Sequence, residues 1–283
     1  MKIFHNKTDL STHIHSLKAK EASIGFVPTM GALHKGHLSL VNFGLSDNDF
    51  VVVSIFVNPT QFNNPEDLKK YPRTLDRDVE LLQTISDSKI LVYAPTVEDI
   101  YENNVASQSF TFGGLEHEME GAFRPGHFDG VGTIVKRLLE IVKPDKAYFG
   151  QKDFQQLLIV KKMAELYKIP TEIIGCPIFR AADGLAMSSR NERLKSEHRE
   201  AAPFIYRTLK SAKEKFGTKS AKAVTEWVAK QFKKQELLEL EYFLIADTKT
   251  LKPVKRKSTK KVYRAFIAVY ADDIRLIDNI ALN

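Results

Sequence analysis

Cysteine is almost absent from this chain of 283 residues, because Cys176 is the only one. A single cysteine excludes an internal disulfide framework and also the paired cysteines that bind structural zinc. The first ten residues, MKIFHNKTDL, contain no apolar segment of the length found in signal peptides. We therefore expect a cytoplasmic protein.

Long hydrophobic runs are lacking as well. The run around residues 50–57 is about as long as a strand, which is far short of the roughly 20 residues that a membrane helix needs. No membrane span is predicted. A chain of this length can bury a sizeable core and is expected to form about two domains.

Several common motifs are also missing. The chain contains no G-x-G-x-x-G and no G-x-x-x-x-G-K-[ST] sequence, so dinucleotide binding of the usual kind and P-loop chemistry are both disfavoured. It has no H-E-x-x-H sequence either, which disfavours a zinc peptidase.

What the chain does contain is a glycine-rich junction, FVPTMGALHKGHLSLV, at residues 26–41. A short apolar run at residues 23–28 is typical of a buried parallel strand, and apolar residues then recur at helical spacing. Gly31 and Gly36 let the main chain approach a ligand, while the new helix points free N–H groups and the positive end of its dipole toward it. This turn is predicted to bind an anion such as phosphate.

His34 and His37 lie three residues apart in this turn. They can project from the same side, where their ring N–H groups can donate to phosphate oxygens. Two other interpretations stay open at this point: ordinary capping or surface histidines, and a zinc site, for which further ligands are missing.

An H-x-G-H sequence after a first strand resembles the signature of adenylyl-transferring enzymes, which include class I aminoacyl-tRNA synthetases and small nucleotidylyltransferases. Further blocks follow in order: FVNPTQF (56–62), YPRTL (71–75), FRPGHFDGV (123–131), YFGQKDFQQ (148–156) and LAMSSRN (185–191). Together, over about residues 26–193, they resemble the pantothenate synthetases, or pantoate:β-alanine ligases. Gln151 stands where this family often has Glu.

The resemblance implies an ATP-dependent condensation of pantoate with β-alanine to pantothenate, AMP and pyrophosphate, through an enzyme-bound pantoyl-adenylate. Mg²⁺ is expected to accompany ATP, and no protein metal site is assigned. It also suggests a homodimer, without nucleic-acid or membrane partners. Alternatives are another adenylyl transferase of the same fold and, in a different class, an RNA-binding protein.

Charge builds at phosphorus when a carboxylate attacks the α-phosphate of ATP, and fixed donors lower that barrier. We expect His37, His34 and Lys152 to supply this catalysis, with His37 foremost. As a cation His37 would stabilise the developing charge, and it could protonate a leaving oxygen.

The residues expected to bind ATP form three groups: Met30, Gly31, Ala32, Leu33, His34, Lys35, Gly36 and His37; Gly150, Gln151, Lys152 and Asp153; and Phe179, Met187, Ser188, Ser189 and Arg190. By resemblance, Gly150 and Asp153 meet the ribose, and residues 187–190 form a second phosphate-contacting loop. Its serines could instead cap a helix.

Pantoate presents hydroxyls beside a carboxylate, so its pocket needs neutral groups that both donate and accept, such as glutamine. By resemblance Gln61 and Gln156 hold pantoate with Asn58 close by, and Gln61 also meets β-alanine. Gln61 follows a buried strand, at whose carboxyl end ligands collect. Residues 63–74 are polar and are predicted to form a mobile cover over the site.

Five short apolar runs are predicted to form strands: residues 23–29, 50–57, 89–95, 143–150 and 171–179. They alternate with helical patterns that begin at His37, Asp76, Val131 and Phe154. This α/β pattern predicts a Rossmann-like, doubly wound and mostly parallel sheet in a domain spanning residues 1–180. Two basic amphipathic helices, at residues 197–216 and 221–235, then precede three strand-like runs. They predict a smaller C-terminal α+β domain, residues 181–283, that closes over the active site.

The net charge of +7 arises partly from residues 252–261, KPVKRKSTKK, which carry six positive charges. Because no aromatic residues interleave with them to stack bases, a solvated hairpin connection is favoured over an RNA contact.

Overall fold

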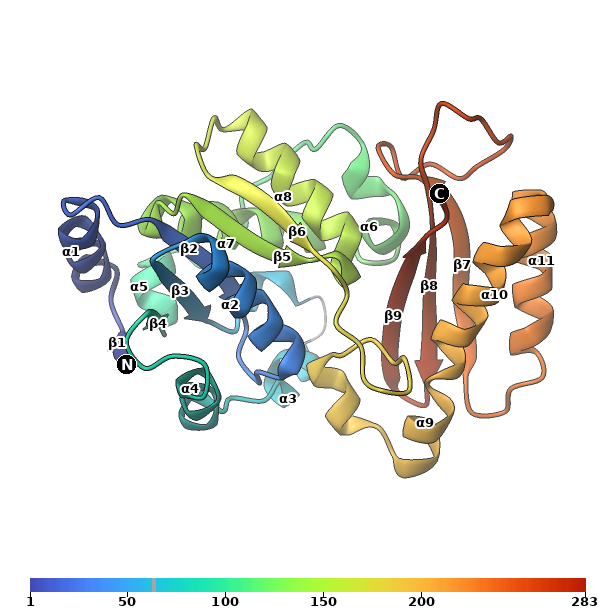
Figure 1. The fold of residues 1–283 in the computed structure, drawn as a ribbon, viewed down its shortest axis with the longest axis horizontal. Helices are drawn as coiled ribbons and strands as arrows, with labels where there is room; N and C mark the ends of the chain where they lie inside the picture. Colours follow the sequence, from blue (N-terminus) through green and yellow to red (C-terminus); the bar gives the residue numbers. More distant parts are fainter. Residues whose placement is uncertain (63–64) are drawn as a thin grey trace. The chain divides into compact units, whose positions relative to one another are not determined.

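The computed structural model describes residues 1–62 and 65–283. They divide into two compact units (Figure 1): the first comprises Met1–Gln151 and Gln155–Pro177, and the second comprises Lys152–Phe154 and Ile178–Asn283. The predicted cover begins at residues 63–64, and this part of it lies outside the described residues.

A six-stranded parallel sheet forms the centre of the first unit, with the strand order β1-β4-β3-β2-β5-β6. The strands are β1 (Lys2–Phe4), β2 (Ile24–Thr29), β3 (Phe50–Ile55), β4 (Ile90–Tyr93), β5 (Lys146–Gly150) and β6 (Glu172–Cys176). Five of the six coincide with the predicted apolar runs. The exception is β1, whose three residues are too few to form such a run.

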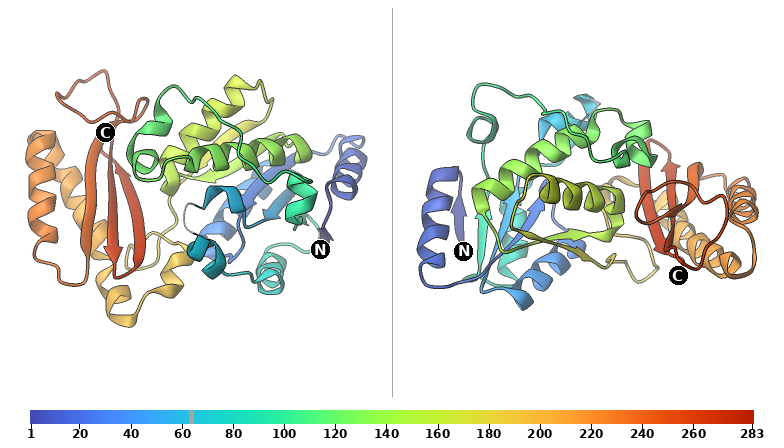
Figure 2. Two further views of the ribbon diagram at one scale, coloured as in Figure 1. Left: turned by 180° about the vertical axis from the view of Figure 1, so that it is seen from behind. Right: turned by 90° about the horizontal axis from the view of Figure 1, so that it is seen from above.

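Helices cover both faces of this sheet. The helices described before the second unit are α1 (Lys7–Lys18), α2 (Lys35–Asp47), α3 (Pro65–Lys70), α4 (Leu75–Gln83), α5 (Val97–Tyr101), α6 (Met119–Phe123), α7 (His127–Val142) and α8 (Phe154–Leu166), with 3₁₀ turns η1 (Pro59–Gln61), η2 (Leu115–His117) and η3 (Gln151–Asp153). Phe26 of β2 packs in a core with α1, α7 and α8, whereas its neighbour Val27 packs with α2 and α4. Helix α2 faces the viewer in Figure 1, and α7 faces the viewer in the left view of Figure 2.

The first unit therefore has the doubly wound α/β fold predicted from the sequence. Strand β2 lies between β3 and β5, and the chain moves from β2 toward one edge of the sheet before it returns to form β5 on the other side. Such a reversal leaves a crevice at the carboxyl ends of the strands, where ligands bind in this fold. The segments that follow β2 and β3 meet there, where Gln61 contacts Met30.

The second unit contains an antiparallel sheet of β7 (Glu239–Asp247), β8 (Tyr263–Ala271) and β9 (Ile274–Ala281). It also contains η4 (Ser189–Arg193) and helices α9 (Ser196–Ala201), α10 (Phe204–Thr218) and α11 (Ala221–Phe232). Helices α10 and α11 pack their apolar stripes on one face of this sheet (Figure 2). This is the predicted small α+β arrangement.

Two features of the second unit test details of the sequence interpretation. A single helix over residues 197–216 is wrong, because the chain breaks into α9 and α10 at Pro203. Proline has no N–H to donate, and its ring clashes with the carbonyl one turn earlier. The basic segment 252–261 connects β7 to β8, as the interpretation of a hairpin connection predicted.

Candidate active site

A tight turn joins β2 to α2. Gly31 and Ala32 have positive φ angles of 84° and 50°, which is common for glycine and strained for alanine. His34 then adopts an extended conformation as the N-cap of α2. The turn lies at the carboxyl end of β2, where the sequence placed it.

The two histidines of the turn form a reciprocal cap. The Gly36 N–H donates to His34 Nδ1 at 3.1 Å, and the His34 N–H donates to His37 Nδ1 at 3.3 Å. The two ring centroids are 4.0 Å apart. The capping interpretation of the two histidines therefore holds, and both caps use Nδ1 of the ring.

This cap determines how the rings can donate. A neutral imidazole has one donor and one acceptor nitrogen, so an Nδ1 that accepts places the ring hydrogen on Nε2. In this arrangement a neutral ring of either histidine carries its hydrogen on Nε2. The expectation that His37 acts as a cation stays a prediction, and it would require a hydrogen on Nδ1 in place of the bond from the His34 N–H.

The backbone N–H groups before the helix are used inside the protein. Gly31 donates to Thr29 Oγ1 at 3.1 Å, while Ala32 and Leu33 donate to the two carboxylate oxygens of Asp78 at 2.9 and 2.7 Å. The expectation of free N–H groups concerned the helix itself, and it is wrong there for Gly36 and His37, whose N–H groups donate to His34 Nδ1 and to the His34 carbonyl. Side chains must therefore supply more of the anion contacts than the sequence suggested.

Asp78, on α4, has no exposed surface. Besides the two N–H groups, it accepts a hydrogen bond from Thr74 Oγ1 at 3.3 Å. Burial raises the pKa of the Asp78 carboxyl, and the donated hydrogen bonds oppose that shift. Sequence reasoning missed this residue, although it lies three positions after the YPRTL block.

The segment after β3 carries Gln61 on η1. Asn58, only 1% exposed, donates through Nδ2 to Gln61 Oε1 and to the Gly130 carbonyl, both at 3.2 Å. Its Oδ1 accepts from Tyr101 at 2.5 Å and from Thr60 at 3.2 Å. All four hydrogen-bonding positions of the Asn58 amide are thus occupied, and none remains for the predicted contact with pantoate.

The FRPGHFDGV block holds the backbone of the same segment. The Gln61 carbonyl accepts hydrogen bonds from His127 Nδ1 at 2.9 Å and Arg124 at 3.3 Å. Gly130 is required because a Cβ there would lie 2.4 Å from the Thr60 carbonyl oxygen. This block contributed to the family resemblance, but no role was predicted for its residues.

The segment after β5 contains two neighbouring glutamines in different surroundings. Gln155 is buried, accepts the Glu120 N–H, and donates to the carbonyls of Leu115 and Glu118. Gln156 is partly exposed. No hydrogen bond of the Gln156 side chain occurs within the described part of the protein, and its contact with pantoate stays a prediction.

The GQKD loop begins where β5 ends. A Cβ on Gly150 would have no described atom within 4 Å, and Gln151 donates to the Gly175 carbonyl at 3.2 Å. Lys152 belongs to the second unit, where the Asn279 amide donates to its carbonyl at 2.8 Å. The Lys152 ammonium lies 3.8 Å from the Asp153 carboxylate.

The remaining predicted ATP contacts also belong to the second unit. The Met187 N–H donates to the Phe179 carbonyl at 3.0 Å, at the base of a hairpin, and Phe179 keeps 39% of its surface exposed. Ser188 caps η4 by accepting the Arg190 N–H at 3.3 Å. The capping alternative therefore holds for Ser188, while Ser189 and Arg190 are half-buried within η4.

In the first unit, the structure brings the histidine turn and Gln61 into contact, because Gln61 Nε2 lies 2.8 Å from Met30 Sδ. Lys35 is exposed at the first position of α2.

No group of three or more His, Cys, Asp or Glu side chains in the described ranges could hold a metal ion. Within the same ranges, no helix is long and apolar enough to cross a membrane.

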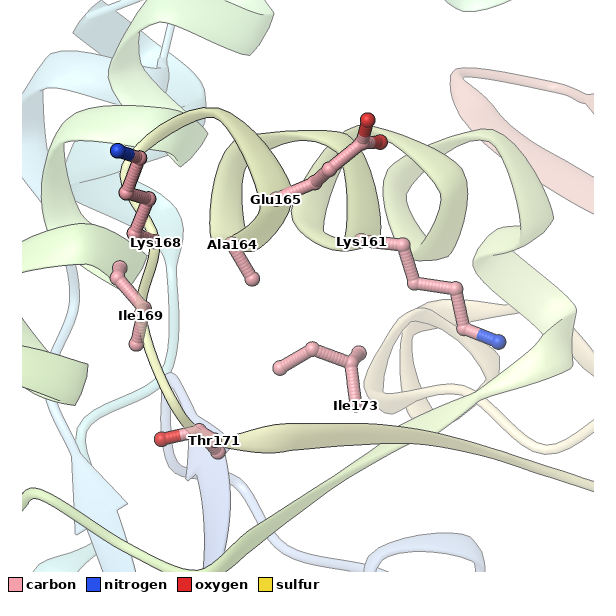
Figure 3. A pocket seen from close by; sticks show the side chains of 7 residues that line it. All are labelled: Lys161, Ala164, Glu165, Lys168, Ile169, Thr171 and Ile173. Atoms are coloured by element: carbon pink, nitrogen blue, oxygen red, sulfur yellow. The ribbon is translucent and has the colours of Figure 1, made fainter.

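A pocket between the end of α8 and the start of β6 contains none of the predicted site residues (Figure 3). Its lining includes Lys161, Lys168 and Thr171. Because Thr171 precedes β6, this pocket lies at the amino ends of the parallel strands. It therefore lies at the opposite end of the strands from the histidine turn, residues 30–37.

A doubly wound parallel sheet with a histidine-capped helix after β2 defines a nucleotide-binding α/β protein. The family model for pantoate-beta-alanine ligase matches residues 2–281. The chain belongs to this family, so the family predicted from the sequence is confirmed, and the predicted ligase activity with it.

Curated relatives match over the whole chain. The pantothenate synthetases of Flavobacterium psychrophilum and Christiangramia forsetii are 61% and 58% identical to it, over 282 and 283 residues and 100% of each chain.

Solved structures agree. A pantothenate synthetase from Thermus thermophilus has a TM-score of 0.91 at 39% identity, covering 100% of this chain and 99% of that one. A pantoate-beta-alanine ligase from Francisella tularensis, complexed with beta-gamma ATP and beta-alanine, has a TM-score of 0.80 at 36% identity, covering 100% and 98%.

Proposed function

We propose that this chain joins pantoate to β-alanine with ATP, through an enzyme-bound pantoyl-adenylate. The pantoate carboxylate attacks the α-phosphorus of ATP, and the bond to pyrophosphate breaks. The unprotonated amine of β-alanine then attacks the acyl carbon, and AMP leaves as pantothenate forms. The family match over residues 2–281 carries this proposal, and the paired Nε2–H donors at the carboxyl edge of the sheet support it.

Negative charge grows on the phosphate oxygens during the first step, so donors fixed in advance lower its barrier. His34 and His37 offer Nε2–H groups that their caps hold in place. Lys152 adds a full positive charge. Because the cap favours neutral rings, the histidines act as hydrogen-bond donors, and Lys152 carries the electrostatic part.

Pantoate binds through the amides of Gln61 and Gln156, and β-alanine meets Gln61 afterwards. Two observations support these roles: Gln61 contacts Met30 of the histidine turn, and Gln156 keeps its amide available. Asn58 holds the Gln61 side chain by donating a hydrogen bond to its Oε1, and does not itself contact pantoate.

ATP contacts the turn at Met30–His37 and the GQKD loop, with Gly150 and Asp153 toward the ribose. The C-terminal domain, residues 181–283, supplies Met187, Ser188, Ser189 and Arg190 as phosphate contacts, and Phe179 offers an exposed aromatic ring to the nucleotide. Mg²⁺ arrives bound to ATP and offsets phosphate charge. The family resemblance further supports a cytoplasmic homodimer without nucleic-acid partners.

AMP release measured with each substrate omitted in turn tests the proposal. We expect AMP and pantothenate in equal amounts when pantoate, β-alanine and Mg-ATP are all present, and no steady release when any one is left out. A nucleotide-linked product with no AMP would instead indicate another adenylyl transferase. Salt-dependent RNA binding without ATP-dependent product would indicate an RNA-binding protein.

A further inference from the structure

The hydrogen-bond network behind Gln61 fixes which atom of its side chain faces the substrate. The Gly130 carbonyl can only accept, so the Asn58 atom 3.2 Å from it must be the amide nitrogen. The same nitrogen lies 3.2 Å from the Gln61 side chain, which must therefore present its oxygen to Asn58. Nε2 of Gln61 is left on the opposite side, toward Met30.

A buried tyrosine completes this network. The Tyr101 hydroxyl, on a residue 2% exposed, donates to Asn58 Oδ1 at 2.5 Å and lies 3.0 Å from Thr60 Oγ1. Burial raises the pKa of Tyr101, so the hydroxyl keeps its proton near neutral pH. Tyr101 belongs to α5, a five-residue helix that no quoted sequence block includes.

We propose that Tyr101 is a positioning residue of the reaction: acting through Asn58, it holds Gln61 so that its amide nitrogen faces the substrate. This inference rests on the proposed function, since it assigns Gln61 an acceptor oxygen of pantoate as its partner. A sulfur atom is a weak acceptor, so Met30 Sδ yields one Gln61 hydrogen readily to a substrate oxygen. Tyr101 itself touches no substrate.

Removing one hydroxyl tests the proposal. Tyr101→Phe should raise the KM for pantoate about tenfold and leave the KM for ATP within twofold, because Asn58 keeps only Thr60 as a donor to Oδ1. Introduced into Gln61→Ala, the same change should have no further effect on pantoate use, since it acts through Gln61.

Tyr93→Phe is the matched control. Tyr93 is fully buried in the same unit, and its hydroxyl donates to Asp99 Oδ2 at 2.6 Å, outside the Asn58 network. Tyr93→Phe should lower thermal stability as Tyr101→Phe does and leave the KM for pantoate unchanged. Equal increases in the KM for pantoate in both variants would overturn the proposal. A further loss of pantoate use when Tyr101→Phe is added to Gln61→Ala would overturn it as well.

Side-chain amide NMR separates this inference from the proposed function, because it needs no substrate. With glutamine labelled by ¹⁵N, the Gln61 signal is assigned by its loss in Gln61→Ala. Tyr101→Phe should shift that signal, whereas Tyr93→Phe should not. An unmoved signal in Tyr101→Phe refutes the positioning role. A shifted signal in an enzyme that shows no pantoate-dependent AMP release supports the positioning role and refutes the proposed function instead.

Discussion

The histidine turn, residues 30–37, and the amide segment, residues 56–61, lie at the same edge of the sheet but are held in different ways. A buried carboxylate, Asp78, holds the turn by accepting two backbone N–H groups. Neutral groups, Asn58 and Tyr101, hold the amide segment. In both, side chains from a distant part of the first unit hold the segment by hydrogen bonds.

The difference follows from what each segment is proposed to bind. Charge-assisted hydrogen bonds are stronger than neutral ones, and the turn must hold a strained Ala32 while a polyphosphate binds. The amide segment needs a defined direction of donation, which a neutral network supplies. We therefore expect changes in the turn to impair ATP use, and changes in the amide segment to impair pantoate use.

The largest effect on catalysis is expected for His37 of the histidine turn. His37→Ala removes an Nε2–H donor to the developing phosphate charge and should lower kcat about a hundredfold or more. AMP release measures it, with His117→Ala as control because that ring is 80% exposed. A rate within threefold of the parent would remove His37 from the mechanism.

A smaller effect is expected for Asp78, the buried carboxylate that holds the turn. Asp78→Asn keeps the size of the side chain, but its NH₂ would face one of the two N–H groups that the carboxylate now accepts. Leaving a buried donor unsatisfied costs about 1–3 kcal/mol, so the KM for ATP should rise about thirtyfold, with little change in the KM for pantoate.

Asp145→Asn is the control for Asp78→Asn, because Asp145 accepts the Ile24 N–H at 2.7 Å at the opposite end of β2. It should leave both KM values unchanged. If Asp78→Asn raised the KM values for pantoate and ATP equally, the contrast between turn and amide segment would be lost.

The smallest effect is expected for the glutamines. Gln61→Ala and Gln156→Ala should each weaken pantoate binding about tenfold and spare ATP, as calorimetric titration can show. Gln155→Ala should behave oppositely, with a lower melting temperature and normal pantoate binding, because that amide is bonded to three backbone groups. ATP affinity that fell as far as pantoate affinity would contradict the pocket assignment.

The fold was largely predictable because buried parallel strands are short apolar runs. What escaped prediction depended on weak local signals. Strand β1 has only three residues, and helix α7 begins at His127, four residues before the predicted Val131. Glycines at positions 130 and 132 disfavour a helix locally, but Gly130 is needed for its close approach to Thr60.

The site was predictable where one motif contains all its parts. The histidine cap lies within four consecutive residues, so its position could be read from the sequence. Asp78 lies 46 residues from Ala32, and Tyr101 lies 43 residues from Asn58. Folding alone brings these pairs together, and no local pattern marks an aspartate or tyrosine as a partner of a distant loop.

Isotope exchange tests the central claim most directly. None of the residues proposed to bind ATP and pantoate needs the amine, so enzyme, pantoate and Mg-ATP alone should exchange labelled pyrophosphate into ATP. Adding β-alanine should not be required. Exchange that appeared only with β-alanine present would contradict the account, because the amine would then take part before any adenylate had formed.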